Sequence, residues 1–153
     1  MSETLDLPFR SAGQLAAMLR QQQISATELL ELYLARVAAH NPALNAIIVS
    51  DAERAGKAAK AADERLSKGE ALGPLDGVPM TIKDSFNWTG SPTTWGVPEH
   101  KDNIATSDAC AVERLAAAGA NIFGKTNVPY LLSDWQSFNE IYGTTNNPWD
   151  LTR

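Results

Sequence analysis

Cysteine and histidine are scarce in this sequence, which has one cysteine, Cys110, and two histidines among 153 residues. A lone cysteine cannot form an intrachain disulfide, and no cysteine and histidine set has the spacing of zinc ligands. The sequence also has no G-x-S-x-G nucleophile elbow and no glycine-rich phosphate loop. A structural zinc site is therefore excluded, the common serine-hydrolase and nucleotide-hydrolase motifs are missing, and no cofactor is expected.

Basic side chains are also in short supply, with 13 Lys and Arg against 18 Asp and Glu and a formal net charge of -5. Nucleic acids and anionic membranes attract basic surfaces, so neither is expected as a partner. No run approaches the roughly 20 apolar residues of a membrane span, and the first six residues are acidic where a secretory signal is basic. We expect one globular, cytoplasmic protein, since 44% hydrophobic content supports a core.

The first third of the sequence predicts helices. Ser11 precedes Gln14 by three residues, and Ser25 precedes Glu28 by three, so two capping boxes open two helices. The second helix is expected to stop at His40-Asn41-Pro42, because proline disfavours helix in the residue before it. A short strand over 46–49 and a largely solvent-facing helix over 51–68, closed by Gly69, complete this part.

Turn residues dominate from residue 73 onward, and two strands and a helix stand out among them. Val78, Met80 and Ile82 alternate with polar residues and Pro79, which predicts a half-buried strand with its proline at the start or on an edge. Lys83 then ends this strand, facing away from the apolar row. A helix over 106–118, with Val112, Leu115 and Ala116 inward and Gly119 as terminator, precedes a strand over 121–124. This helix-then-strand order indicates an α/β layer fold.

Few side chains suggest chemistry by themselves. Cys110 is expected mid-helix as a small core side chain, because nothing near it in sequence would lower its pKa. Lys83 is the more interesting base, since a lysine ending an apolar strand must reach water or lose its charge. Spacing alone favours the first alternative. Lys125, after Gly124, is expected to be more loop-like and structural.

Five motifs in register over residues 72–153 carry a resemblance to a known family. They are Leu75-Asp76-Gly77-Val78-Pro79-Met80-Thr81-Ile82-Lys83-Asp84, Gly90 with Thr93-Thr94-Trp95-Gly96, the 108–120 segment ending Ala118-Gly119-Ala120, Gly124-Lys125-Thr126-Asn127, and Gly143-Thr144-Thr145-Asn146-Asn147-Pro148-Trp149-Asp150. In this order and spacing the sequence resembles the amidase signature family. The resemblance predicts two parts: a helical N-terminal segment, 1–71, and the start of the catalytic core, 72–153.

The resemblance implies an α/β/α fold around a mixed central sheet, preceded by helices. It also implies hydrolysis of carboxamides or esters by a serine nucleophile, a second serine and a lysine. Only the lysine maps onto this chain, at Lys83, because the sequence has no Gly-Gly and no Ser-Ser pair. We therefore expect an N-terminal fragment that is inactive alone and that needs the remainder of the amidase fold. The aromatic, turn-rich stretch 142–150 reads as if it should lead into another element.

The loop after Asn127 departs from many relatives of that family, which carry Glu-Phe-like residues there. In the family it passes near the reacting serine, so Leu132 and Ser133 are candidates for substrate contact. Tyr130 and Trp135 are expected instead to fill the core beneath the loop, because aromatic side chains dominate burial.

Three functions stay open at this point. The first is a hydrolase for small amide or ester substrates, and the second is a non-catalytic remnant or interaction module. The third, within the family, is the A subunit of a transfer-RNA-dependent amidotransferase, which the acidic balance disfavours slightly. The substrate and the preference for amide or ester are undetermined, and a homo-oligomer is left open.

Overall fold

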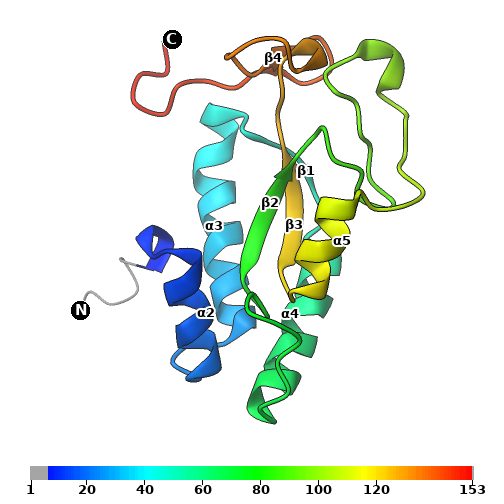
Figure 1. Ribbon diagram of the computed structural model, residues 1–153. Coiled ribbons are helices and arrows are strands. Elements are labelled where there is room, and N and C mark those ends of the chain that lie inside the picture. Colours follow the sequence, from blue (N-terminus) through cyan, green and yellow to red (C-terminus); the bar gives the residue numbers. More distant parts are fainter. Residues whose placement is uncertain (1–6, 153) are drawn as a thin grey trace. The chain divides into compact units, whose positions relative to one another are not determined.

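The computed structural model describes residues 7–152, in which helices alternate with short strands (Figure 1). The α-helices are α2 (Ala12–Arg20), α3 (Ala26–Leu44), α4 (Ala52–Ser67) and α5 (Cys110–Ala117). The strands are β1 (Ile47–Ser50), β2 (Pro79–Lys83), β3 (Asn121–Thr126), β4 (Phe138–Asn139) and β5 (Gly143–Thr144). Short 3-10 helices cover Leu7–Phe9, Pro98–His100 and Tyr130–Leu132. None of the helices within 7–152 is long and apolar enough to cross a membrane.

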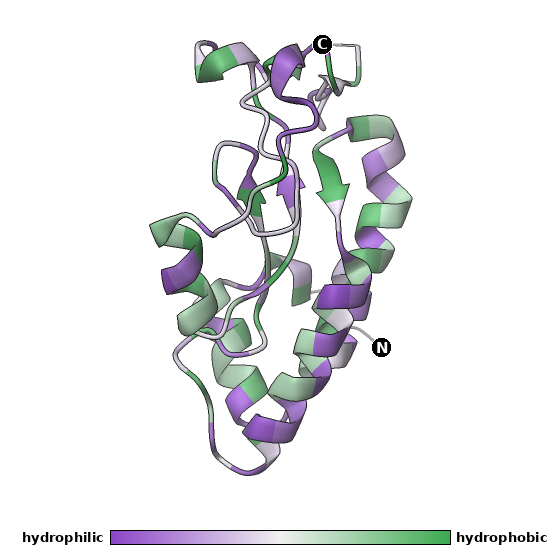
Figure 2. Ribbon diagram, turned by 90° about the vertical axis from the view of Figure 1, so that its right-hand side faces the viewer, coloured by the Kyte–Doolittle hydropathy of each residue, from purple (hydrophilic) through white to green (hydrophobic). Residues whose placement is uncertain are grey.

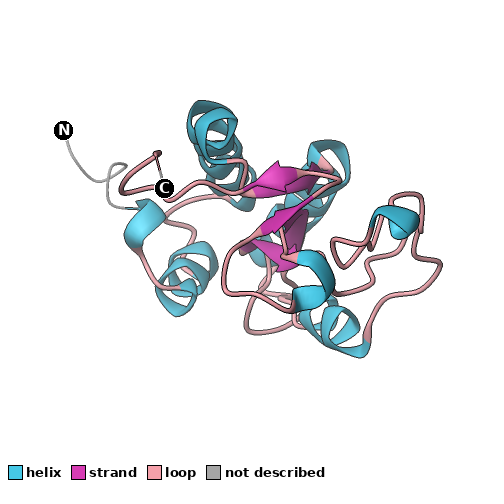
Figure 3. Cartoon of the chain, turned by 90° about the horizontal axis from the view of Figure 1, so that it is seen from above, coloured by secondary structure: helices cyan, strands magenta, loops and turns pink. Residues whose placement is uncertain are grey.

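The larger sheet has three strands in the order β1-β3-β2, which lie side by side (Figure 3). Strand β1 is antiparallel to β3. Strand β2 is parallel to β3, because the Asn121 amide donates to Val78 and, further along both strands, the Asp84 amide donates to Thr126. The sheet is therefore mixed, and the expected α/β class is confirmed. Pro79 is the first residue of β2, at the edge of this sheet, where a missing amide donor costs least.

Close contacts divide the chain into two compact units. The first comprises residues 7–35, 52–80 and 114–123, and the second comprises 36–51, 81–113 and 124–152. Strands β2 and β3 contribute residues to both units. These two units do not test the division that the sequence predicts between residues 71 and 72, which stays a prediction.

The core of the first unit forms where small side chains let helices approach. Gly77 stands at this junction, because a Cβ built on it would lie 2.8 Å from the Ala26 Cβ on α3 and 3.4 Å from the Ala62 Cβ on α4. Helix α4 buries a stripe made of Ala55, Ala59, Ala62 and Leu66, so it is less solvent-facing than its charged composition suggested. The helices carry hydrophilic and hydrophobic residues together, as amphipathic helices do (Figure 2).

Both predicted capping boxes are present. Ser11 and Gln14 exchange side-chain and backbone hydrogen bonds at the start of α2, and Ser25 and Glu28 do the same before α3. A second carboxylate adds to the cap of α3: Asp63 of α4 accepts from the Ala26 amide at 2.6 Å. Helix α4 therefore fixes the direction in which α3 begins.

The predicted stop at His40-Asn41-Pro42 is wrong, because α3 continues through Pro42 to Leu44. A proline near the end of a helix removes one hydrogen bond, and the last turn is still closed by the Asn45 amide, which donates to the Asn41 carbonyl at 2.7 Å. Asn45 itself has φ of 54°, the left-handed conformation that ends many helices.

Several side chains expected inside are outside. Cys110 is the first residue of α5 rather than a mid-helix residue, and it is exposed, as is Ala116. Tyr130 is 50% exposed and Trp135 is fully exposed, so neither fills the core. A 3-10 turn covers Tyr130–Leu132 and includes left-handed backbone at Leu131 and Leu132, a conformation that the sequence pattern did not indicate.

Gly119 gives a direct test of the close packing in the first unit. Its φ is +89°, and a Cβ would lie 2.5 Å from the Asp76 Cα, so Gly119→Ala must strain the backbone and displace its neighbour. We expect this change to lower the free energy of unfolding by at least about 2 kcal/mol. Gly56→Ala is the matched control, since its site within α4 is open and alanine should add about 0.5–1 kcal/mol. Urea denaturation of both variants measures the difference, and equal stabilities would contradict it.

Candidate active site

Two ionisable residues of opposite charge stand at the end of β2. Lys83 is the last residue of the strand and its side chain is exposed, whereas Asp84 follows it and is completely buried. Successive side chains of a strand point to opposite faces, and the strand pairing extends one residue further because the Asp84 amide donates to the Thr126 carbonyl at 3.1 Å. Within residues 7–152 the Lys83 ammonium has no hydrogen-bond or ion-pair partner. Its position is as expected, and its catalytic role stays a prediction.

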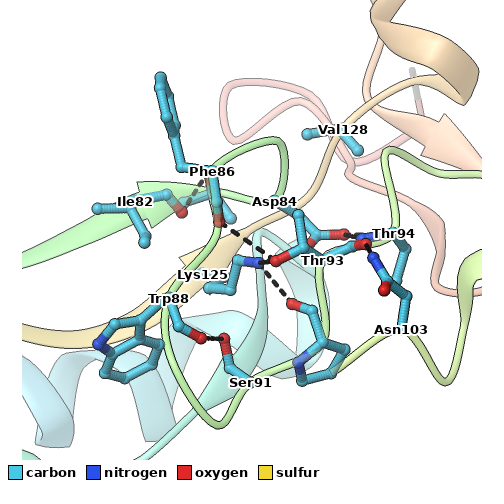
Figure 4. Close-up of polar contacts among 12 residues, drawn as sticks. Ile82, Asp84, Phe86, Trp88, Ser91, Thr93, Thr94, Asn103, Lys125 and Val128 are labelled. Carbon is cyan, nitrogen blue, oxygen red and sulfur yellow. Dashed lines mark hydrogen bonds and ion pairs between the residues drawn. The ribbon is translucent and has the colours of Figure 1, made fainter. Parts of the chain in front are cut away.

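Lys125 of β3 is buried with no exposed surface, which overturns the expectation of a loop-like lysine reaching water. Its Nζ lies 2.8 Å from Asp84 Oδ1 and donates to the Pro92 carbonyl at 2.5 Å and to Thr93 Oγ1 at 2.9 Å. Figure 4 shows the ammonium directed into this ring of oxygens. An ammonium has three protons to donate, and each has an acceptor here. Lys125 is thus fully engaged inside the protein.

The loop carrying Thr93 and Thr94 completes the surroundings of the Asp84 carboxylate. Thr94 donates its hydroxyl to Asp84 Oδ2 at 2.5 Å, and its backbone amide donates to the same oxygen at 3.3 Å. The Gly96 amide in turn donates to Thr94 Oγ1 at 3.1 Å. Oδ1 faces only the ammonium within the described part of the chain, so both oxygens of the carboxylate are engaged.

Burial and the charge of Asp84 both act on the pKa values of Lys125 and Tyr142. Burial lowers the pKa of Lys125 from that of an exposed lysine, and the hydrogen bond and charge of Asp84 oppose this shift. Burial also raises the pKa of Tyr142, with a further contribution from the negative charge of Asp84. The carboxylate therefore influences groups on two neighbouring segments.

A chain of backbone hydrogen bonds leads from Asp84 to the candidate substrate-contact loop. The Trp95 amide donates to the Asp84 carbonyl at 3.3 Å, and the Leu131 amide donates to the Trp95 carbonyl at 2.8 Å. Trp95, Leu131 and Leu132 all have positive φ, at 55°, 49° and 60°. Such conformations are uncommon for large side chains and persist where surrounding contacts enforce them.

The structure places the predicted residues in the same unit without direct contact between them. Leu132 is half-buried, and Ser133 is exposed with its hydroxyl donating to the Tyr130 carbonyl at 2.8 Å. No hydrogen bond among residues 7–152 joins Lys83 to either of them. Their substrate contact stays a prediction.

A second polar clamp holds the segment that follows β3. Asn127 donates to the Gly143 carbonyl and to Thr145 Oγ1, both at 3.0 Å, and its own oxygen accepts from Asn139 at 2.8 Å. Asn139 Oδ1 accepts the amides of Ile141 and Tyr142 at 2.9 Å each. Two buried amide side chains thus fix the loop of residues 137–145 against the end of β3.

Sequence reasoning missed the pairing of Asp84 with Lys125 and the parts played by Thr93 and Thr94. In the sequence these residues stand in separate motifs, and no single motif indicates that they meet. A usable signal was the strand pattern: Asp84 and Lys125 both stand near strand ends rich in apolar residues, where a charge needs a partner.

The geometry defines an α/β protein with an exposed lysine at the end of a strand and a buried ion pair that begins at the next residue. Comparison with known proteins identifies its family: the family model "Amidase" matches residues 28–153. The chain belongs to the amidase family.

Similar proteins include both hydrolases and one component of an amidotransferase. The A subunit of glutamyl-tRNA(Gln) amidotransferase from Acidothermus cellulolyticus is 43% identical over 97% of this chain and 29% of its own length. Indoleacetamide hydrolase of Bradyrhizobium diazoefficiens is 46% identical over 92% of this chain and 27% of its own length. The structure of 6-aminohexanoate cyclic dimer hydrolase complexed with substrate matches 97% of this chain and 29% of that chain, with a TM-score of 0.84 and 36% identity. The chain therefore spans less than a third of the length of these relatives.

The buried ion pair predicts strong coupling between Asp84 and Lys125. We expect Asp84→Asn or Lys125→Met to lower the free energy of unfolding by about 3–5 kcal/mol, because each leaves a buried charge unpaired. The double variant should cost less than the sum of the two single changes, by about 1–3 kcal/mol. The control is Glu53→Gln, which removes the exposed Lys57–Glu53 pair and should change stability very little. Additive effects in urea denaturation would show that the buried pair is not coupled.

Proposed function

We propose that this chain forms the part of an amide-hydrolysing enzyme that carries the general base, Lys83. The observation supporting this most directly is the contrast between the two lysines: Lys125 has an acceptor for each proton, whereas the Lys83 ammonium has none within 7–152. An exposed amine at the carboxyl end of a strand lies where sites in α/β folds collect. Similarity to the indoleacetamide hydrolase supports a carboxamide as substrate.

The proposed reaction uses Lys83 in its neutral form. Lys83 accepts a proton from a bridging serine, which takes the proton of a second, nucleophilic serine. The nucleophilic oxygen then bonds to the substrate carbonyl carbon, the C–N bond breaks, and the amine leaves with the transferred proton. Water afterwards hydrolyses the acyl ester and regenerates the serine. Backbone amides of a glycine-rich turn would stabilise the negative carbonyl oxygen.

The serines and the glycine-rich turn are proposed to come from sequence that these 153 residues do not contain. The sequence has no Ser-Ser and no Gly-Gly pair, and it spans less than a third of its relatives. The complete site would therefore join this chain to the remainder of the fold. Small amides or esters as substrates, a cytoplasmic location and the absence of a nucleic-acid partner all stay predictions.

A second candidate function is that of the A subunit in a glutamyl-tRNA amidotransferase, favoured by the 43% identity to that protein. The two candidates differ in what accepts the acyl group or the ammonia. A hydrolase releases acid and ammonia from a simple carboxamide by itself, whereas an amidotransferase component requires its partner and an aminoacylated transfer RNA. Ammonia release from simple amides, with and without these components, distinguishes them.

Lys83 is tested by replacement in the complete enzyme. Lys83→Ala should lower kcat by at least about 10²-fold to 10⁴-fold, because the proton acceptor is lost. Lys83→Arg should not rescue activity, since a guanidinium stays protonated. The control is Lys60→Arg on the exposed face of α4, which should keep kcat unchanged. A Lys83→Arg enzyme with near-normal kcat and an unchanged pH profile would rule out Lys83 as the base.

The 153-residue chain alone should not hydrolyse amides or esters. It carries a base but no paired serines or glycine-rich oxyanion donors in its sequence, so an aryl amide should turn over at the buffer rate. Liberated amine measured by absorbance provides the test, with the complete enzyme as positive control. Turnover that survives repurification and disappears with Lys83→Ala would refute this expectation.

A further inference from the structure

The peptide that joins Lys83 to Asp84 is held at both of its polar atoms. The Lys83 carbonyl accepts from the Phe86 amide at 3.0 Å, and the Asp84 amide donates to Thr126 at 3.1 Å. The Asp84 side chain is held in addition by Lys125 and Thr94. The peptide on the carboxyl side of Lys83 is therefore held by hydrogen bonds at both its carbonyl and its amide.

The buried pair cannot itself meet a substrate. Asp84 and Lys125 have no exposed surface, and their polar atoms are taken up by each other, by Pro92 and by Thr93 and Thr94. Replacing a buried ion pair by apolar residues is often neutral or stabilising, so stability alone does not explain a charged pair at this position. A role connected with the adjacent Lys83 does explain it.

We infer that the buried Asp84–Lys125 pair, with Thr94, positions Lys83 for proton transfer. The inference rests on the proposed function of Lys83 and deepens it. Asp84 is bonded directly to Lys83, and its carboxylate joins β3 and the Thr93–Thr94 loop to the end of β2. Displacement of a catalytic group by about 1 Å can cost about 10²-fold in rate. The pair is also neutral as a whole, so it fixes the strand end without imposing net charge on the amine.

Thr94 offers the mildest test, because Thr94→Val keeps the volume of the side chain and removes its hydroxyl. In the complete enzyme we expect Thr94→Val and Asp84→Asn to lower kcat by about 10-fold to 10²-fold, with KM changed by less than about 3-fold. Thr94→Ser restores the hydroxyl and should recover most of kcat. Rates are measured at a temperature where each variant is folded by circular dichroism.

The matched control is Asp76→Asn in the first unit. Asp76 is a buried carboxylate 2.6 Å from Arg65 Nη2, so its replacement also breaks an ion pair, in the first unit rather than the second. We expect Asp76→Asn to lower the melting temperature and leave kcat of the folded enzyme unchanged. An equal loss of kcat in Asp76→Asn and Asp84→Asn would overturn the inference.

The pH dependence of kcat/KM provides a second readout, which should not change if the ion pair only stabilises the fold. The titratable groups around Asp84 are Lys83 on β2, Lys125 on β3 and Tyr142 after β4, so the profiles are recorded in a Tyr142→Phe background. Asp84→Asn leaves a positive neighbour and should move the acid limb of kcat/KM to lower pH, whereas Lys125→Met leaves a negative neighbour and should move it to higher pH. Unmoved limbs in both variants would overturn the inference.

The failure of this inference is distinguishable from failure of the proposed function. If Lys83→Ala abolishes turnover and the Thr94 and Asp84 variants keep wild-type kcat, the positioning role is wrong and the base assignment stands. If Lys83→Ala keeps wild-type kcat, both are wrong.

Discussion

A buried ammonium must be surrounded by oxygen atoms, and this requirement shapes the second unit. Lys125 finds its acceptors on the residue after β2 and on the loop that follows, so three segments are joined at one point. The loop could not move away from the strands without removing two of the three acceptors of the ammonium, and each lost hydrogen bond to a charged group costs about 1.5–3 kcal/mol. The positions of Thr93, Thr94 and Trp95 follow from this one constraint, since each bonds to Asp84 or to Lys125.

Predictions from the sequence were correct for local structures that depend on residues close to them in the sequence. The capping boxes at Ser11 and Ser25 involve partners three residues away, and the glycine terminators at Gly69 and Gly119 depend on their own backbone conformation, with φ of 74° and 89°. The strand ending at Lys83 was also predictable, because the alternation of apolar and polar residues and the initial proline are properties of the strand's own sequence. The family motifs then provided the fold class.

Predictions failed where a contact or a turn outside the apolar pattern decides the outcome. Lys125 meets Pro92, which is 33 residues away, and nothing within the Gly124–Thr126 stretch indicates which acceptors will reach it. Helix α3 passes Pro42 because the Asn41 side chain accepts the Ala46 and Ile47 amides beyond the helix, which stabilises the last turn. Trp135 is outside because the preceding turn, with two left-handed leucines, sets the direction of the chain. In each case a contact or a backbone turn that the apolar pattern does not reveal overrides a sound local preference.

The two lysines show how placement on a strand assigns different tasks to one residue type. Both stand near the ends of adjacent parallel strands, but Lys125 shares the buried side with Asp84, whereas Lys83 precedes Asp84 by one residue and therefore faces the other side. A shift of one residue along β3 would turn Lys125 away from Asp84, and a shift of one residue along β2 would place Lys83 on the buried side without a carboxylate partner. The ion pair thus selects one register, and in that register the side chain of Lys83 is exposed.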